Sequence, residues 1–105
     1  MIDFANLEMT PMEGICGGNG IIFVSPNFVA GNTVMSAMIV PPGSSIGLHE
    51  HLTKDGVTEV YQVLNGDAPK INGVRTKVAV CQPGESHDLV NDTETELTVL
   101  SIKSK

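Results

Sequence analysis

Short runs of β-branched residues, each closed by glycine, proline or asparagine, constrain the fold of this chain more than any other feature. Runs of this length, separated by turn residues, are typical of the strands of a sandwich or barrel. No long stretch has the 3.6-residue period of an amphipathic helix. The sequence therefore predicts an all-β fold, with a loose edge strand and a loop in the glycine-rich segment before Gly20. The expected strands span residues 20–24, 33–40, 59–64, 68–71, 77–81, 87–91 and 97–102.

Two Asn-Gly pairs lie between the expected strands, at Asn65-Gly66 and Asn72-Gly73. Asn-Gly is a strong signal for a tight turn because both residues tolerate a positive φ. We therefore expect the chain to turn sharply after the run 59–64 and again after residue 71. The chain has 105 residues, the size of one ordinary domain, so we predict a single domain over residues 1–105.

The charge of the chain is strongly acidic: twelve acidic residues against six basic ones give a formal net charge of −6. A field of that sign repels phosphate groups, so nucleic acid and membrane surfaces are not expected partners. No apolar stretch approaches the length of a membrane span, and residues 1–4 lack the basic start of a signal peptide. We therefore expect a cytoplasmic protein. Cys16 and Cys81 are then expected to be reduced, with one disulfide between them as the alternative.

The three histidines of the chain are spaced in an informative way. His49 and His51 are two residues apart, and on an extended strand residues i and i+2 point to the same face, with Cα atoms roughly 6.5 Å apart. Two imidazoles placed in this way can converge on one metal ion at N–metal distances of about 2.0–2.2 Å. Glu50 lies between them and must point the other way, which makes it a poor ligand.

Two further donors could complete such a site. Glu59 opens an otherwise apolar strand, an unusual place for a carboxylate without a cation partner. His87 opens the strand that follows Pro83-Gly84. Taken singly, each has a structural explanation: an exposed His-x-His pair, a surface carboxylate and a turn-capping histidine. Taken together, three imidazoles and one carboxylate favour a metal site with coordination positions left open for water or substrate.

These spacings resemble the two sequence motifs of the cupin superfamily. The first motif, from a glycine through His-x-His to a glutamate and a glycine, is represented by Gly43, His49, His51, Glu59 and Gly66. The second is represented by Pro83, Gly84, His87 and Asn91. The resemblance implies a double-stranded β-helix, or jelly-roll, barrel, and a positive φ at Gly66 and Gly84. It also implies that one metal ion is bound by His49, His51, Glu59 and His87.

One departure from the family pattern affects the ligand assignment. Seven residues separate His51 from Glu59, where cupins usually have three or four. Asp55 lies at the usual glutamate spacing and is therefore the rival ligand. Glu59 is preferred because it keeps the six-residue gap to Gly66 and begins the apolar strand. The extra segment, residues 52–58, is expected to form a loop at the mouth of the barrel.

Strand parity predicts which side chains face the interior. If Glu59 points inward, so do Tyr61 and Val63. Tyr61 is therefore a candidate catalytic residue, able to donate a hydrogen bond or a proton to a metal-bound molecule, or else it simply fills the barrel. Cys81 could touch the cavity, although a buried inert thiol is the simpler interpretation.

The resemblance and the ligand set together predict the broad function. Three histidines and a carboxylate suit one divalent transition metal, namely Mn, Fe, Co, Ni, Cu or Zn. We expect a metal-dependent oxygenase, isomerase or lyase acting on a small, neutral or weakly anionic organic molecule. The single arginine, Arg75, argues against a sugar-nucleotide substrate. The alternative is a non-catalytic cupin that binds or senses a small molecule. Small cupins often pair edge strands, so a homodimer formed through the N-terminal strand is also expected.

Overall fold

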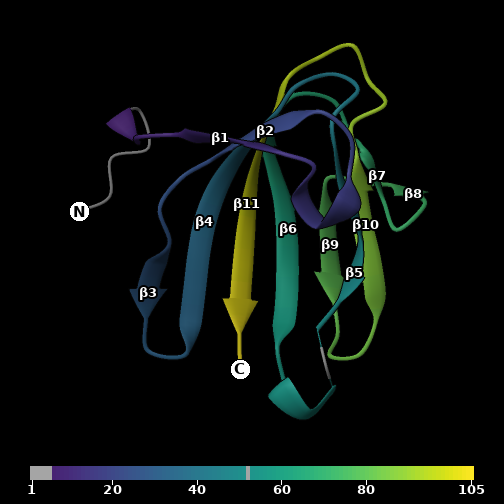
Figure 1. Cartoon of the computed structure of the whole chain (residues 1–105). Coiled ribbons are helices and arrows are strands. Elements are labelled where there is room, and N and C mark those ends of the chain that lie inside the picture. Colours follow the sequence, from purple (N-terminus) through teal and green to yellow (C-terminus); the bar gives the residue numbers. More distant parts are fainter. Residues whose placement is uncertain (1–5, 52) are drawn as a thin grey trace.

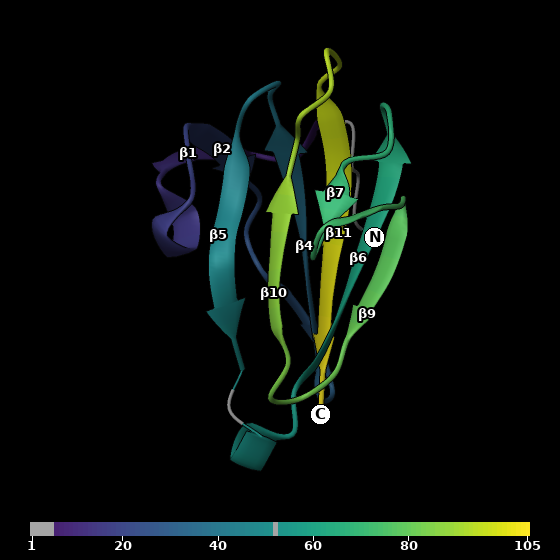
Figure 2. The same cartoon turned by 90° about the vertical axis from the view of Figure 1, so that its right-hand side faces the viewer.

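Two antiparallel sheets face each other in the computed structural model, which describes residues 6–51 and 53–105 (Figures 1 and 2). The larger sheet has the order β1 (Thr10–Glu13), β2 (Ile21–Val24), β4 (Thr33–Val40), β11 (Leu97–Ser104), β6 (Thr58–Asn65) and β9 (Val78–Cys81), with β3 (Phe28–Ala30) also paired to β4. The smaller sheet has the order β5 (Ser45–Glu50), β10 (Ser86–Val90), β7 (Lys70–Ile71) and β8 (Val74–Arg75). In Figure 2, β5 and β10 lie in front of β4, β11 and β6. The all-β prediction is confirmed.

The core lies between the two sheets and follows the two-residue period of the strands. On β11, Leu97 and Val99 are fully buried, and Thr98 between them is half-buried. Val40 of β4 and Leu89 of β10 pack into the same core. Polar side chains are buried as well, and Ser101, Glu59 and His87 are three of them. The interior is therefore apolar at one end and polar at the other, where the candidate site lies.

The two Asn-Gly turns differ in what they connect. Asn72-Gly73 closes a tight hairpin between β7 and β8, and both residues have a positive φ, 51° and 76°. Asn65-Gly66 ends β6, but the next strand, β7, belongs to the other sheet. Gly66 and Gly84 have φ values of 101° and 82°, which confirms the positive φ expected at both. A Cβ at Gly66 would also lie only 2.6 Å from the Glu96 carbonyl oxygen.

The predicted strands are confirmed with shifts of one or two residues at most of their ends. The run 68–71 is narrower in the structure, because only Lys70–Ile71 is paired. β3, β5 and β8 have no counterpart among the predicted ranges. The three residues of β3 lie between the turn residues Pro26-Asn27 and Gly31-Asn32. The described residues between His51 and β6 include one 3-10 turn, η3 (Thr53–Asp55), at the end of the barrel where β11 ends (Figure 1). Residues 53–57 therefore form the expected mouth loop, whereas Thr58 already belongs to β6 and residue 52 lies outside the described residues.

The N-terminal part of the chain is held against the barrel. β1 pairs with β2 at one edge of the larger sheet, and a second 3-10 turn, η2 (Ile15–Gly17), follows it. The Ser45 amide of β5 donates to the Asn19 carbonyl at 2.9 Å, which holds this segment beside the smaller sheet. β1 is an edge strand, as the homodimer expected from the sequence requires. The homodimer itself stays a prediction. Residues 1–4, on which the absence of a signal peptide was judged, lie outside the described residues.

No helix in the described part of the chain is long and apolar enough to cross a membrane.

Candidate metal centre

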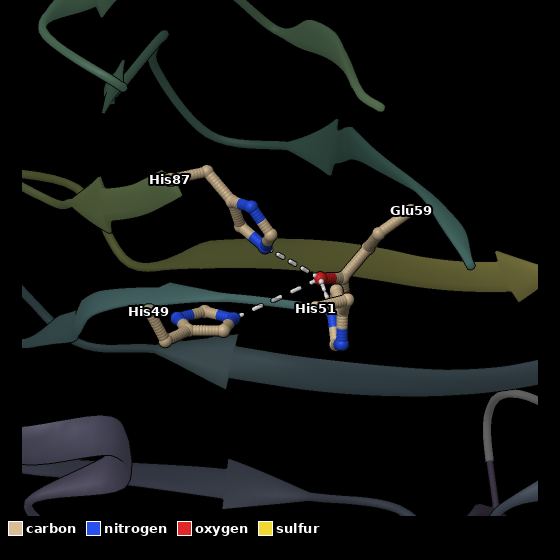
Figure 3. Close-up of side chains that lie close together, drawn as sticks. All are labelled: His49, His51, Glu59 and His87. Atoms are coloured by element: carbon tan, nitrogen blue, oxygen red, sulfur yellow. Dashed lines mark hydrogen bonds and ion pairs between the residues drawn. The ribbon is translucent and has the colours of Figure 1, made fainter. Parts of the chain in front are cut away.

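Four side chains from both sheets converge at the polar end of the interior (Figure 3). His49 lies near the end of β5, directly opposite His87 of β10. The pairing shifts register next to His49: Gly47 and Leu48 of β5 lie opposite the single residue Asp88 of β10. This marks a bulge in β5, and bulges re-aim neighbouring side chains. His51 follows the end of β5, and Glu59 reaches across from β6 in the larger sheet. The two sheets thus supply histidine from one side and carboxylate from the other.

The donor atoms of this cluster are close enough to surround one ion. The Oε1 atom of Glu59 lies 2.8 Å from His87 Nε2, 3.1 Å from His51 Nε2 and 3.9 Å from His49 Nε2. All four candidate donor atoms lie within 4.8 Å of one another. Ligands about 2.0–2.2 Å from one metal ion stand roughly 3–4 Å apart, so this donor set fits a metal without rearrangement of the backbone.

The backbone orients two of the imidazoles so that Nε2 faces the cluster. His49 Nδ1 lies 2.7 Å from the Gly47 carbonyl oxygen, and His87 Nδ1 lies 3.2 Å from that of Glu85. A carbonyl oxygen only accepts, so each Nδ1 must carry the hydrogen, and in the neutral ring Nε2 presents a lone pair. Such contacts to the outer ring nitrogen are typical of metal-binding histidines. Lone pairs facing the Glu59 carboxylate oxygen repel it unless a cation lies between them.

The Glu59 carboxylate is buried and held in its ionised form. Burial raises the pKa of this carboxyl, but hydrogen bonds from Ser101 and His51 and the charge of Lys103 outweigh that effect, so the pKa lies below its usual 4.5. Ser101 Oγ donates to Oε2 at 2.6 Å, which leaves Oε1 for the histidines. Glu59 is therefore a carboxylate at neutral pH, the form that binds a metal ion.

The structure brings Glu59, and not Asp55, to the histidines. Asp55 is exposed on η3 and is not part of the cluster. Glu50 is exposed as well, as its position between the two histidines predicts. Tyr61 is buried beside the cluster, with its ring 5.8 Å from that of His87. Burial and the charge of Glu59 raise the pKa of the Tyr61 phenol, so it stays protonated and its hydroxyl can donate a hydrogen bond. Its inward orientation confirms the parity argument.

A cavity of about 180 Å³ lies beside the cluster. Its polar lining includes His49, Glu59, Tyr61, Ser101 and Lys103, and apolar side chains such as Met38 and Ile46 line much of the rest. Pockets for drug-sized ligands have volumes of about 300–1,000 Å³, so this cavity suits a smaller molecule. A second hollow of about 280 Å³ lies outside it and is lined by His51, Lys103, Lys105 and neighbouring residues.

The sequence reasoning missed two residues of this site, Ser101 and Lys103. Both lie on β11, at the positions that continue the inward face of Leu97 and Val99. A signal for both was present in the sequence. Residues 97, 99, 101 and 103 lie on one face of a strand, and along this face the side chains change from apolar to polar.

Cys16 and Cys81 are free thiols in very different surroundings, which predicts selective labelling. Burial, together with the charges of Glu59 and Glu85, raises the pKa of the Cys81 thiol to about 11. At pH 8 this lowers its thiolate fraction by about a hundredfold relative to an ordinary thiol. Iodoacetamide should therefore label exposed Cys16 in the folded protein and Cys81 only after unfolding, as peptide mass spectrometry would show. A Cys16→Ser variant that is labelled at the same rate when folded would contradict the buried position of Cys81.

Comparison with known proteins gives a consistent set of relatives, although no family model matches the chain. A Thermotoga maritima protein named an oxalate-binding protein is 36% identical over 75 residues, which cover 66% of this chain. The chain spans 60% of the length of that relative. A crystal structure from Thermotoga maritima, described as a predicted oxalate decarboxylase, superposes with a TM-score of 0.84 and 25% identity, covering 99% of this chain and 97% of that one.

A third protein supports the fold alone. It is a Cupin 2 conserved barrel domain protein from Salinispora arenicola, with a TM-score of 0.60 and 20% identity, covering 100% of this chain and 86% of that one. Both solved structures match nearly the whole chain, and the two cupin motifs lie at the convergent site. The chain is therefore a small cupin, and its two facing sheets form the jelly-roll barrel of that fold.

Proposed function

We propose that His49, His51, Glu59 and His87 bind one divalent transition metal, and that this site acts on a small carboxylate of the oxalate class. The observation that carries the first part is the orientation of the histidines. Backbone carbonyls hold Nδ1 of two rings, so their Nε2 lone pairs face an ionised carboxylate oxygen at 2.8 and 3.9 Å. A divalent cation removes that repulsion and uses all four donors.

The choice of ligand rests on the cavity and on the relatives. A volume of about 180 Å³ suits a molecule of a few heavy atoms. Both the Thermotoga maritima relative and the Thermotoga maritima crystal structure have descriptions that refer to oxalate. When bound, a divalent ion supplies a Lewis acid that polarises a carboxylate or carbonyl oxygen. The imidazoles and Glu59 would hold that ion beside the cavity, and apolar side chains such as Met38 and Ile46 line part of the space for the ligand.

The enzyme class we favour is a lyase that cleaves the carbon–carbon bond of oxalate. One oxalate dianion and one proton then give one carbon dioxide and one formate, with no change in the number of electrons. The proton needs a donor at the reacting carbon, and the buried, protonated Tyr61 phenol beside His87 is the candidate. The competing function is capture of oxalate without turnover, which the name of the 36% identical relative favours.

Metal loading and turnover can be measured on the same sample. Elemental analysis of the purified protein, before and after reconstitution with Mn, Fe, Co, Ni, Cu and Zn, should find close to one ion per chain. A metal at a hundredfold excess over its dissociation constant should raise the melting temperature by roughly 10 °C or more. Acid should release the metal, because an imidazole must be neutral to bind it.

Two results would decide between the proposed activities. Formate and carbon dioxide released in equal amounts from oxalate support the lyase, whereas oxalate binding without consumption supports the binding protein. A protein that takes up no transition metal after reconstitution, or whose metal content is unchanged after His49 and His51 are both replaced by alanine, would contradict the metal site itself.

A further inference from the structure

We infer that Lys103 selects the ligand by charge: its ammonium group binds a carboxylate group of a small dianion held at the metal site. This inference rests on the proposed function. Lys103 lies on the inward face of β11, directly opposite Glu59 of β6 in the strand pairing. It lines both the inner cavity beside the cluster and the outer hollow next to His51. Within the described part of the chain, Lys103 is the one lining residue that the two spaces have in common.

The ammonium group of Lys103 is close to the Glu59 carboxylate but forms no hydrogen bond with it. Lys103 Nζ lies 4.0 Å from Glu59 Oε2, beyond hydrogen-bond distance, and Ser101 already donates to that oxygen at 2.6 Å. Among the described residues, no hydrogen bond is formed by Nζ, and the side chain is 45% exposed. If the role of Lys103 were only to neutralise Glu59, a direct contact would be expected. Its three donors remain available to a ligand.

The charges that line the cavity point to a dianion. Among the described residues that line it, Glu59 and Lys103 are the charged groups apart from histidine, and their charges cancel. A bound divalent ion therefore leaves the cavity with a net charge of 2+, within a chain whose formal charge is −6. That local charge matches a dicarboxylate, and without Lys103 it would match only a monoanion.

Lys103→Met tests this inference, with Lys105→Met as the matched control. The control removes the same charge from a lysine that lines only the outer hollow. The measurement is the affinity of metal-loaded protein, by isothermal titration calorimetry, for oxalate and for oxamate, in which an amide replaces one carboxylate. Losing a hydrogen bond to a charged group should weaken oxalate binding by about tenfold or more. Oxamate binding should change little, so the preference for oxalate should collapse. Lys105→Met should keep the wild-type preference.

The outcomes separate this inference from the function on which it rests. Metal content of Lys103→Met should equal that of the wild type, because Lys103 is not a ligand. If the wild type binds oxalate and Lys103→Met binds it equally well, the role of Lys103 is refuted while the proposed function stands. Loss of metal from Lys103→Met, or equal weakening of oxalate and oxamate, would show that Lys103 acts through Glu59, and this also overturns the inference. If metal-loaded wild type binds neither molecule, both proposals fail.

Discussion

Glu59→Gln is expected to remove most of the bound metal, whereas Asp55→Asn should leave the metal content unchanged. Both substitutions exchange a carboxylate for an amide of the same size, so they compare the two acidic residues that the widened gap after His51 allows as ligands. Glu59 has its Oε1 atom within 3.9 Å of all three imidazoles, while Asp55 is exposed on η3. Replacing an indirect partner of a metal ligand costs about 10–100-fold in metal affinity, so loss of a ligand should cost at least about 100-fold.

Competition with a chromophoric chelator gives the dissociation constants, and elemental analysis after gel filtration gives the occupancy. Circular dichroism should show a folded Glu59→Gln protein, because the amide oxygen can still accept from Ser101. If Asp55→Asn loses its metal and Glu59→Gln retains it, the loop that carries Asp55 must close over the cluster when metal binds. The assignment of Glu59 would then be wrong.

The residues of the metal cluster were predictable because their signals are local. The i, i+2 spacing places His49 and His51 on one face, and parity along β6 turns Glu59 and Tyr61 toward the interior. These rules need only the order of residues along one strand. The match to two cupin motifs then supplied what local rules lack, namely that His87 meets the other three.

The role of Lys103 was not predictable, because it depends on how distant strands pair. Lys103 is opposite Glu59 only in the observed register of β6 and β11, and that register shifts between Thr98 and Val99. A slip of one residue would turn Lys103 to the other face of the sheet. If the partner strand is unknown, the change from apolar to polar side chains along β11 is equally consistent with a strand that frays at its end.

The contact between the N-terminal segment and β5 could not be predicted from the sequence either. A Cβ on Gly47 would overlap the Cys16 carbonyl oxygen, and one on Gly18 would overlap that of Ser45. Two glycines therefore let the segment lie directly on β5, where Ile15 and Cys16 line the inner cavity. Glycine-rich sequence before a strand reads as a loose loop. Only the close approach of the two backbones shows that these glycines bring the segment into contact with the site.

Asn91, the last residue of the second cupin motif, is expected to contribute the largest single share of stability among the buried polar side chains. It is fully buried and follows β10. Its Nδ2 donates to the carbonyl oxygens of Val40 and Thr95, both at 2.9 Å, and its Oδ1 accepts from Thr93 N at 3.1 Å and Thr93 Oγ1 at 2.6 Å. One amide thus joins the end of β4 in the larger sheet to the loop between β10 and β11.

Asn91→Ala should therefore lower the free energy of unfolding by about 3–4 kcal/mol, because the buried Val40 carbonyl loses the hydrogen bond from Asn91 and a small cavity forms. For a domain of this size, that is a fall in melting temperature of roughly 15 °C. Asn19→Ala is the matched control, since exposed Asn19 donates one side-chain bond to the Gly43 carbonyl near the same end of the barrel. Water can replace that bond, so its loss should cost about 1 kcal/mol or less. Urea unfolding curves of the metal-free proteins would measure both. Equal destabilisation by the two variants would mean that Asn91 does not link the two sheets as its contacts indicate.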